Sequence, residues 1–284
     1  MTGDIRIFRA AADTFRTLRA EASPVLKITW LPVAMVVAAD VIIKTTGSNP
    51  EAFDLPFWPA RYLLFVAEAL LESIAFVSLF RLLVLGDVSS VRHLRLGNFN
   101  IPLCVQFGRR ELFYALWTVA SGILFLAIPD AARYAVAVHY AAHPDALRSD
   151  FGQLMHNMTL AQSVLMFVQL FALSLLSFTW VYLSVAEKAD VKGFKSSIRA
   201  MYGHILSAVM LNLIFLAPYF IYSFYAQIFV KLHPVITTSR PFLRCDAVAE
   251  TLLLYFGSVM YAVFIAGFYK THCHSREGGN PVPS

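Results

Sequence analysis

The sequence is poor in charged residues and in cysteine, and it lacks the short motifs of common enzymes. Only 14% of its 284 residues are Asp, Glu, Lys or Arg, against about a quarter in soluble domains. Cys104, Cys245 and Cys273 are far apart and form no C-x-x-C pair. The chain contains no Walker loop, dinucleotide fingerprint, G-x-S-x-G or H-E-x-x-H. These absences exclude the corresponding enzyme classes, so we expect no cofactor, no metal site and no catalytic residues.

Apolar residues, in contrast, make up 58% of the chain and occur in long runs. A hydrocarbon core of about 30 Å needs about 20 apolar residues in a helix, and several runs reach this length. The predicted fold is an all-α polytopic membrane bundle that forms a single domain over 1–270. The order of its predicted helices is compatible with three helical hairpins. Its six predicted spans are about 25–43, 61–85, 112–128, 160–185, 205–230 and 248–269. Residues 271–284 are predicted to be a disordered tail.

The basic residues predict how the chain is threaded through the membrane. A net charge of +5 would favour nucleic-acid binding in a soluble protein, but here most of the 23 Lys and Arg residues lie between apolar runs. They concentrate in the N-terminal segment, in 81–110, in 187–203 and at the C-terminus. Because cytoplasmic loops carry an excess of Lys and Arg, we expect both termini in the cytoplasm and no nucleic-acid partner.

Two of these basic segments have the pattern of amphipathic helices. In residues 4–20 the apolar positions share one side of a helix and the arginines the other, and 187–203 repeats this pattern. We expect both helices to lie at the cytoplasmic interface and to contact anionic lipid; docking of a protein partner is the alternative. The basic positions are Arg6, Arg9, Arg16, Arg19, Lys188, Lys192, Lys195 and Arg199. The basic segment 86–110 contains glycine, asparagine and proline, so it is predicted to be irregular.

Two acids lie inside the second predicted span. Glu68 and Glu72 are four residues apart, so they share a helix face with Arg61. A charge near mid-bilayer costs at least about 2.5 to 3.5 kcal/mol, which predicts that this face points into the bundle. Asp40, at the outer end of the first span, lies at a similar depth if the two spans are antiparallel. Alternatively, the Asp40 carboxylate simply reaches interfacial water.

The acid pair has two interpretations, which stay open. In the functional one, Glu68 and Glu72 bind a proton or a cation, since two nearby carboxylates favour a shared proton. In the structural one, Arg61 neutralises Glu68 while Glu72 stays protonated.

Other polar positions predict helix contacts rather than chemistry. Serines and glutamines in span 160–185 are expected to bond across to neighbouring helices, and Ser258, Ala262 and Ala266 form a small-residue stripe. Pro129 and Asp130 are expected to end the third span, with Asp130 capping a separate short helix. His139 and His143 in that helix have metal-compatible spacing, but an exposed polar face is the preferred interpretation.

A family resemblance adds a location. The segment FRAAADTFRTLRA before the first span, the related FKSSIRAMY before the fifth, and six spans with both ends inside resemble poorly characterised bacterial six-span proteins. These are related to the membrane domain of some glycerophosphodiester phosphodiesterases. The resemblance implies a bacterial inner-membrane location and carries over no catalytic residue. The tail THCHSREGGNPVPS is similar to peptides translated from palindromic repeats in proteobacterial genomes, so His272, Cys273 and His274 are not interpreted as a metal site.

Three functions are compatible with these patterns. The first, which the sequence favours over the two alternatives, is a structural or accessory membrane protein held by its basic helices on anionic lipid, on a membrane-protein partner or in a homo-oligomer. The second is a small proton- or cation-coupled transporter that uses the intramembrane acids. The third is a lipid-modifying enzyme, although no nucleophile stands beside a base in the sequence.

Overall fold

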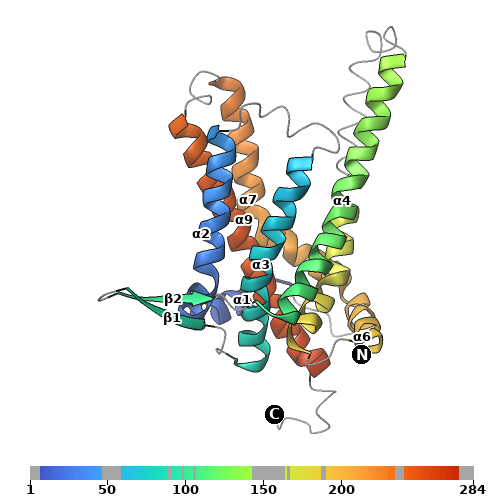
Figure 1. Ribbon diagram of the computed structural model, residues 1–284. Helices are drawn as coiled ribbons and strands as arrows, with labels where there is room; N and C mark the ends of the chain where they lie inside the picture. The colour runs from blue at the N-terminus through green and yellow to red at the C-terminus, as the bar shows by residue number, and fades with distance from the viewer. Residues whose placement is uncertain are drawn as a thin grey trace.

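A computed structural model describes residues 7–46, 59–87, 91–96, 99–104, 107–142, 164, 167–186, 190–233 and 240–274. Its elements are α1 (Ile7–Ala20), α2 (Ala22–Thr46), α3 (Pro59–Leu85), β1 (Val91–Leu96), β2 (Phe99–Cys104), α4 (Arg109–Ala142), the helix Phe167–Val185, α6 (Val191–Tyr202), α7 (Ile205–Leu232), α9 (Arg240–Tyr269) and the π-helical turn η2 (Lys270–His274) (Figure 1). The predicted helical bundle is thus present, and helix continues past Tyr269 into the predicted tail.

Five of the described helices are long and apolar enough to cross a membrane. They contain the segments Ala22–Ile42, Tyr62–Leu85, Phe167–Val185, Ile205–Ala226 and Pro241–His272. This confirms the prediction of a membrane protein with several spans. The predicted third span, 112–128, falls within α4, which is not among these five segments, so the sixth span stays a prediction.

The structure corrects the predicted end of the third span. α4 continues without a break through Pro129 and Asp130 for 34 residues, about 51 Å at 1.5 Å per residue. Asp130 is fully buried, and its Oδ2 accepts a hydrogen bond from the Tyr62 hydroxyl of α3 at 2.8 Å. The prediction that Asp130 caps a separate helix is therefore wrong. The Asp130 carboxylate accepts its hydrogen bond from a neighbouring helix rather than from the start of its own, and it thereby links α4 to α3.

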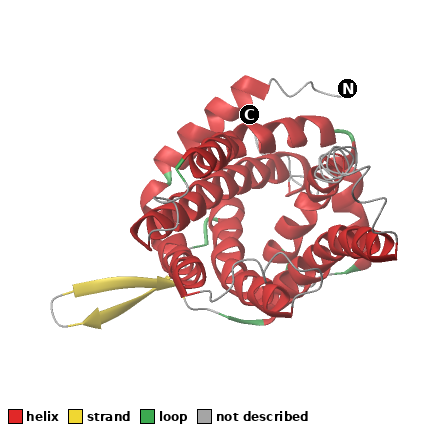
Figure 2. Cartoon of the chain, turned by 90° about the horizontal axis from the view of Figure 1, so that it is seen from above, coloured by secondary structure: helices red, strands yellow, loops and turns green. Residues whose placement is uncertain are grey.

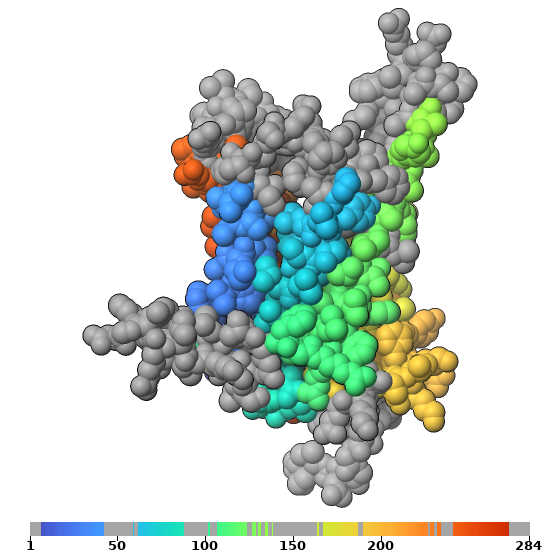
Figure 3. Space-filling model, in the orientation of Figure 1, coloured from blue at the N-terminus to red at the C-terminus, as the bar shows by residue number. Residues whose placement is uncertain are grey.

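The bundle is organised around α9, which packs against α2, α3 and α7. α3 packs against α2 and α4, and these three helices lie side by side on one face of the molecule (Figure 3). Seen along the bundle, the helices are arranged around a common centre (Figure 2). The first and last candidate spans are also in contact, and the consecutive helices α2 and α3, and α7 and α9, pack on each other. The arrangement as three hairpins stays a prediction.

A β-hairpin departs from the all-α prediction. β1 and β2 pair antiparallel, with Val91 opposite Cys104 and Leu96 opposite Phe99. The hairpin is joined to α2 by the Trp30 indole N–H, which donates to the Pro102 carbonyl at 2.7 Å. The expectation of an irregular segment is wrong here, although the Gly97-Asn98 pair between the strands is of the type that short hairpin turns favour.

The amphipathic helices and the hairpin gather at one end of the bundle. α1, β1, β2, α6 and η2 all lie at this end, while α4 extends beyond its neighbours at the other (Figure 1). α1 packs on α9 and α7; its Ala11 is buried, and Phe15 meets Phe215 edge to face at 6.4 Å between ring centroids. The predicted apolar side of α1 is therefore partly covered by protein, yet Phe8 stays 86% exposed.

Candidate functional site

A cavity of about 290 Å³ lies between α3, α4, the helix Phe167–Val185, α7 and α9. This volume is at the lower end of the range for small-molecule sites, about 300 to 1,000 Å³. Its polar lining consists of Glu72, Thr118, Ser177, Asn212 and Ser258. Glu72 stands midway between the ends of α3, so the cavity is central in the bundle.

Three of the predicted site residues come together beside this cavity. Glu72 lines it, and Glu68, one turn away on α3, is close enough to act electrostatically on Glu72. Asp40 of α2 acts in turn on Glu68, and its carboxylate accepts a hydrogen bond from the Thr251 hydroxyl of α9. We call Asp40, Glu68 and Glu72 the carboxylate cluster. Glu72 is its only member that lines the cavity.

The described part of the chain supplies no counter-charge to the cluster. The ion pairs between described residues, Arg16–Asp13 and Arg81–Asp87, do not involve Glu68 or Glu72. Arg61 belongs to α3, but its side chain lies outside the described part. The structural interpretation, in which Arg61 neutralises Glu68, therefore stays a prediction.

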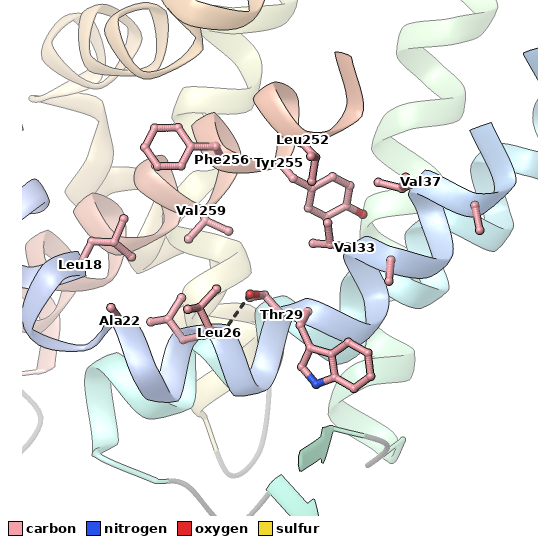
Figure 4. A pocket seen from close by; sticks show the side chains of 14 residues that line it. Leu18, Ala22, Leu26, Thr29, Val33, Val37, Leu252, Tyr255, Phe256 and Val259 are labelled. Atoms are coloured by element: carbon pink, nitrogen blue, oxygen red, sulfur yellow. Dashed lines mark hydrogen bonds between the residues drawn. The ribbon is translucent and has the colours of Figure 1, made fainter. Parts of the chain in front are cut away.

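Tyr255 separates the cluster from a second, larger space. Its side chain is 6% exposed, and its hydroxyl is near enough to Glu72 to interact electrostatically but is not in hydrogen-bonding geometry. On the other side, Tyr255 lines a groove of about 710 Å³ between α2 and α9 (Figure 4). The groove is otherwise almost wholly apolar, with Val33, Leu252 and Phe256 in its walls. It offers a surface for hydrocarbon, whereas the cavity carries the polar chemistry.

The sequence assigned the serines of the cavity to contacts between helices, but the hydrogen bond between helices that the structure shows here comes from a threonine. The Thr118 hydroxyl accepts from the Trp180 indole N–H at 3.2 Å, which joins α4 to the helix Phe167–Val185. The hydroxyls of Ser177 and Ser258 donate to carbonyls of their own helices. Asn212 is 7% exposed and has no hydrogen bond to the described residues. An isolated amide within an apolar run was the signal that could have marked it.

The basic residues lie on the outside of the two amphipathic helices. Arg9, Arg16 and Arg19 of α1 are exposed, and so are Lys192, Lys195 and Arg199 of α6. Arg16 pairs with Asp13 at 3.2 Å, but both side chains are mostly solvent-exposed, so the pair contributes little. Arg6 and Lys188 lie outside the described residues. The two helices thus present charge at the same end of the bundle.

Asp190 fixes the start of α6. Its Oδ1 accepts from the Gly193 amide at 2.7 Å and from the Tyr182 hydroxyl at 2.9 Å, while its own amide donates to the Tyr182 oxygen at 3.0 Å. The hydrogen bonds from Gly193 and Tyr182 lower the pKa of Asp190, with a smaller effect from Lys192. This N-cap joins α6 to the helix Phe167–Val185.

Asp190→Ala is expected to loosen the first turn of α6, because the Gly193 amide loses its acceptor. Hydrogen exchange of the α6 amides should accelerate, and Asp190→Asn, which keeps an acceptor, should have a smaller effect. Since the folded-state pKa is lowered, the wild-type protection is complete above the ordinary Asp pKa and is lost as pH falls through the lowered value. Asp13→Ala, at an exposed position of α1, is the control. Unchanged exchange in Asp190→Ala would contradict the cap.

Within the described residues, no group of three or more His, Cys, Asp and Glu side chains is arranged to hold a metal ion. The His272 ring packs against Phe268 in a tilted arrangement, with ring centroids 4.0 Å apart. The side chains of His139, His143, Cys273 and His274 lie outside the described part. Comparisons with protein-family models, curated proteins and solved structures find no match. A function must therefore be argued from the cavity and the cluster themselves.

Proposed function

We propose that this protein is a small proton- or cation-coupled carrier in which Glu72 binds the coupling ion. The observation that carries this proposal is the position of Glu72: it lines a central cavity, beside other carboxylates and without a described counter-charge. A carboxylate in a low-dielectric interior favours binding of a proton or cation over standing alone as an anion. Glu72 is thus suited to exchange one positive species for another.

Glu68 and Asp40 support this role from outside the cavity. Glu68 is one helical turn from Glu72, so ionisation of one carboxyl group disfavours ionisation of the other. Asp40 is held by Thr251 of α9, which fixes one end of the cluster against the central helix. Asp40 thus attaches the cluster to the contact between α2 and α9.

The proposal includes six spans, with α4 as the sixth. α4 is long enough to cross a bilayer, packs on α3 and is tied to it through Tyr62 and Asp130. The end that carries α1 and α6 holds the exposed basic side chains, so we assign this end and both termini to the cytoplasm. The resemblance to bacterial six-span proteins supports an inner-membrane location.

An accessory role is the second candidate, and the exposed faces of α1 and α6 favour it. Their basic side chains, together with the 86% exposed Phe8, suit contact with anionic lipid or with an acidic membrane-protein partner, including another copy of this chain. A lipid-modifying enzyme stays a hypothesis for which no contact described above offers support.

The carrier proposal is tested by reconstituting the full chain in vesicles that contain a pH-sensitive dye. Sodium, potassium, small amines, amino acids and organic anions are added in turn, and internal pH is recorded against protein-free vesicles. A carrier gives protein-dependent proton movement, or uptake of a labelled cation, with at least one solute. The accessory role is correct instead if two results are found together. No solute produces protein-dependent proton movement or uptake, and gentle solubilisation recovers the protein in a larger complex, from which deletion of residues 1–20 releases it.

A further inference from the structure

The cavity that contains Glu72 is lined by aromatic rings together with aliphatic side chains. Five aromatic side chains line it: Phe76 and Phe80 of α3, Tyr114 of α4, Trp180 of the helix Phe167–Val185, and Tyr261 of α9. Phe76 and Phe80 are 6.3 Å apart between centroids, and Phe80 and Tyr114 are 6.5 Å apart, both in tilted arrangements. The Trp180 ring is held in place by its N–H bond to Thr118. These contacts give the cavity a fixed aromatic wall.

The cavity also contains one acidic side chain and a few buried hydrogen-bonding groups. Among its described lining residues, Glu72 is the only acid, and none is Lys or Arg. Asn212 points an amide without a described hydrogen bond into the same space and is more than nine-tenths buried. The buried Tyr261 hydroxyl lies near Ser174 and Ser177 but is not in hydrogen-bonding geometry with the described residues. Unpaired buried polar groups are costly, so these positions favour a ligand that supplies the missing partners.

We propose that this cavity binds a small organic cation, an alkylammonium compound whose charge lies between Glu72 and the aromatic wall. Resting on the carrier function proposed above, the inference names its substrate class. Ammonium groups are attracted to the faces of Trp, Tyr and Phe, and Glu72 neutralises the charge. Asn212 and Tyr261 bond to any polar group that the ligand carries.

Other ligand classes fit the cavity less well. Ca²⁺ and Mg²⁺ need about six or more oxygen ligands in close geometry, whereas the described lining offers one carboxylate, one amide and scattered hydroxyls. A neutral hydrocarbon would leave Glu72 and Asn212 without partners, and the apolar groove between α2 and α9 offers it a better surface. The volume of about 290 Å³ restricts the ligand to a small molecule.

The test is titration of the purified full chain in detergent with tetramethylammonium, followed by calorimetry and by tryptophan fluorescence. Neutral tert-butanol and Na⁺ are the comparison probes. We expect saturable binding of tetramethylammonium alone, weaker binding at lower pH, and loss of binding in Glu72→Gln. Trp180→Leu should weaken binding about tenfold, while Trp180→Phe, which keeps an aromatic face, should weaken it less. Phe256→Leu in the apolar groove is the matched control and should bind as the wild type does.

The outcomes separate the substrate class from the carrier function. Equal binding of tert-butanol, or equal binding by Trp180→Leu and the wild type, overturns the organic-cation site. Proton-coupled flux with another solute and no tetramethylammonium binding also overturns it, but leaves the carrier proposal standing. Glu72-dependent binding of tetramethylammonium without flux of any solute supports the site and overturns the carrier. Thermal unfolding of each variant identifies a loss of binding that comes from a loss of the fold.

Discussion

Replacing Glu72 by Gln is expected to abolish proton- or cation-coupled flux while leaving the protein inserted and abundant. Gln has nearly the shape of Glu but cannot exchange a proton or carry the charge that holds a cation. Because the described part of the chain gives Glu72 no counter-charge, removing its charge breaks no described ion pair. The unfolding temperature should therefore stay the same or rise, because the variant no longer places an unpaired carboxylate in the bundle interior.

The measurement is initial flux in vesicles at matched protein density, together with the unfolding temperature in detergent. Glu68→Gln should reduce flux, since Glu68 acts on Glu72 but does not line the cavity. Glu111→Gln is the control, because Glu111 lies in the first turn of α4, where it accepts from the Gly108 amide at 2.9 Å, and does not line the cavity. Full activity of Glu72→Gln, or loss of both stability and expression in it, would favour the structural interpretation of the acid pair.

The second large effect is expected from Gly257→Ala, at the closest approach of α7 and α9. A Cβ atom at residue 257 would lie 2.8 Å from the Phe215 carbonyl oxygen and 2.7 Å from Leu216 Cδ2. A backbone oxygen cannot turn aside as the end of a side chain can, so the two helices must separate. Such overpacking costs about 1 to 3 kcal/mol. Since α9 also contributes Ser258 and Tyr261 to the cavity, ligand binding should fall as well.

Gly267→Ala is a matched control because it makes the same change in the same helix. A Cβ atom at residue 267 meets nothing within 4 Å, and alanine is the better helix former by about 1 kcal/mol. Its unfolding temperature should equal or exceed that of the wild type, whereas that of Gly257→Ala should fall. Equal stability of the two variants would show that α7 and α9 are not held at this distance.

Local patterns in the sequence predicted the helices well where apolar residues alone decide the structure. Span 61–85 corresponds to α3, Pro59–Leu85, and the end of span 248–269 coincides with the end of α9 at Tyr269. The prediction was wrong at Pro129 and Asp130, two residues that usually mark the end of a helix when only the neighbouring sequence is considered. There Asp130 finds the Tyr62 hydroxyl on another helix, a partner that no local pattern contains.

The candidate site, like the fold, was predicted from the sequence only in part. The spacing of Glu68 and Glu72 predicted that both point away from lipid, but not which one meets a cavity. Asn212 and Trp180 come from helices far along the chain, and their meeting with Glu72 depends on how those helices pack. Gly257 gave no sign of its role, since the predicted small-residue stripe began at the next residue.

The sequence by itself determined that the chain crosses a membrane several times. The length and apolar composition of a helix are local properties, and they can be compared directly with the thickness of the hydrocarbon core. The sequence also determined that acid lies within a span. Tertiary structure alone decided that α9 is central, that α2 and α9 are neighbours, and that Glu72 faces an aromatic cavity. Helices in lipid associate through shape and a few polar contacts, and these depend on surfaces that only the assembled bundle brings together.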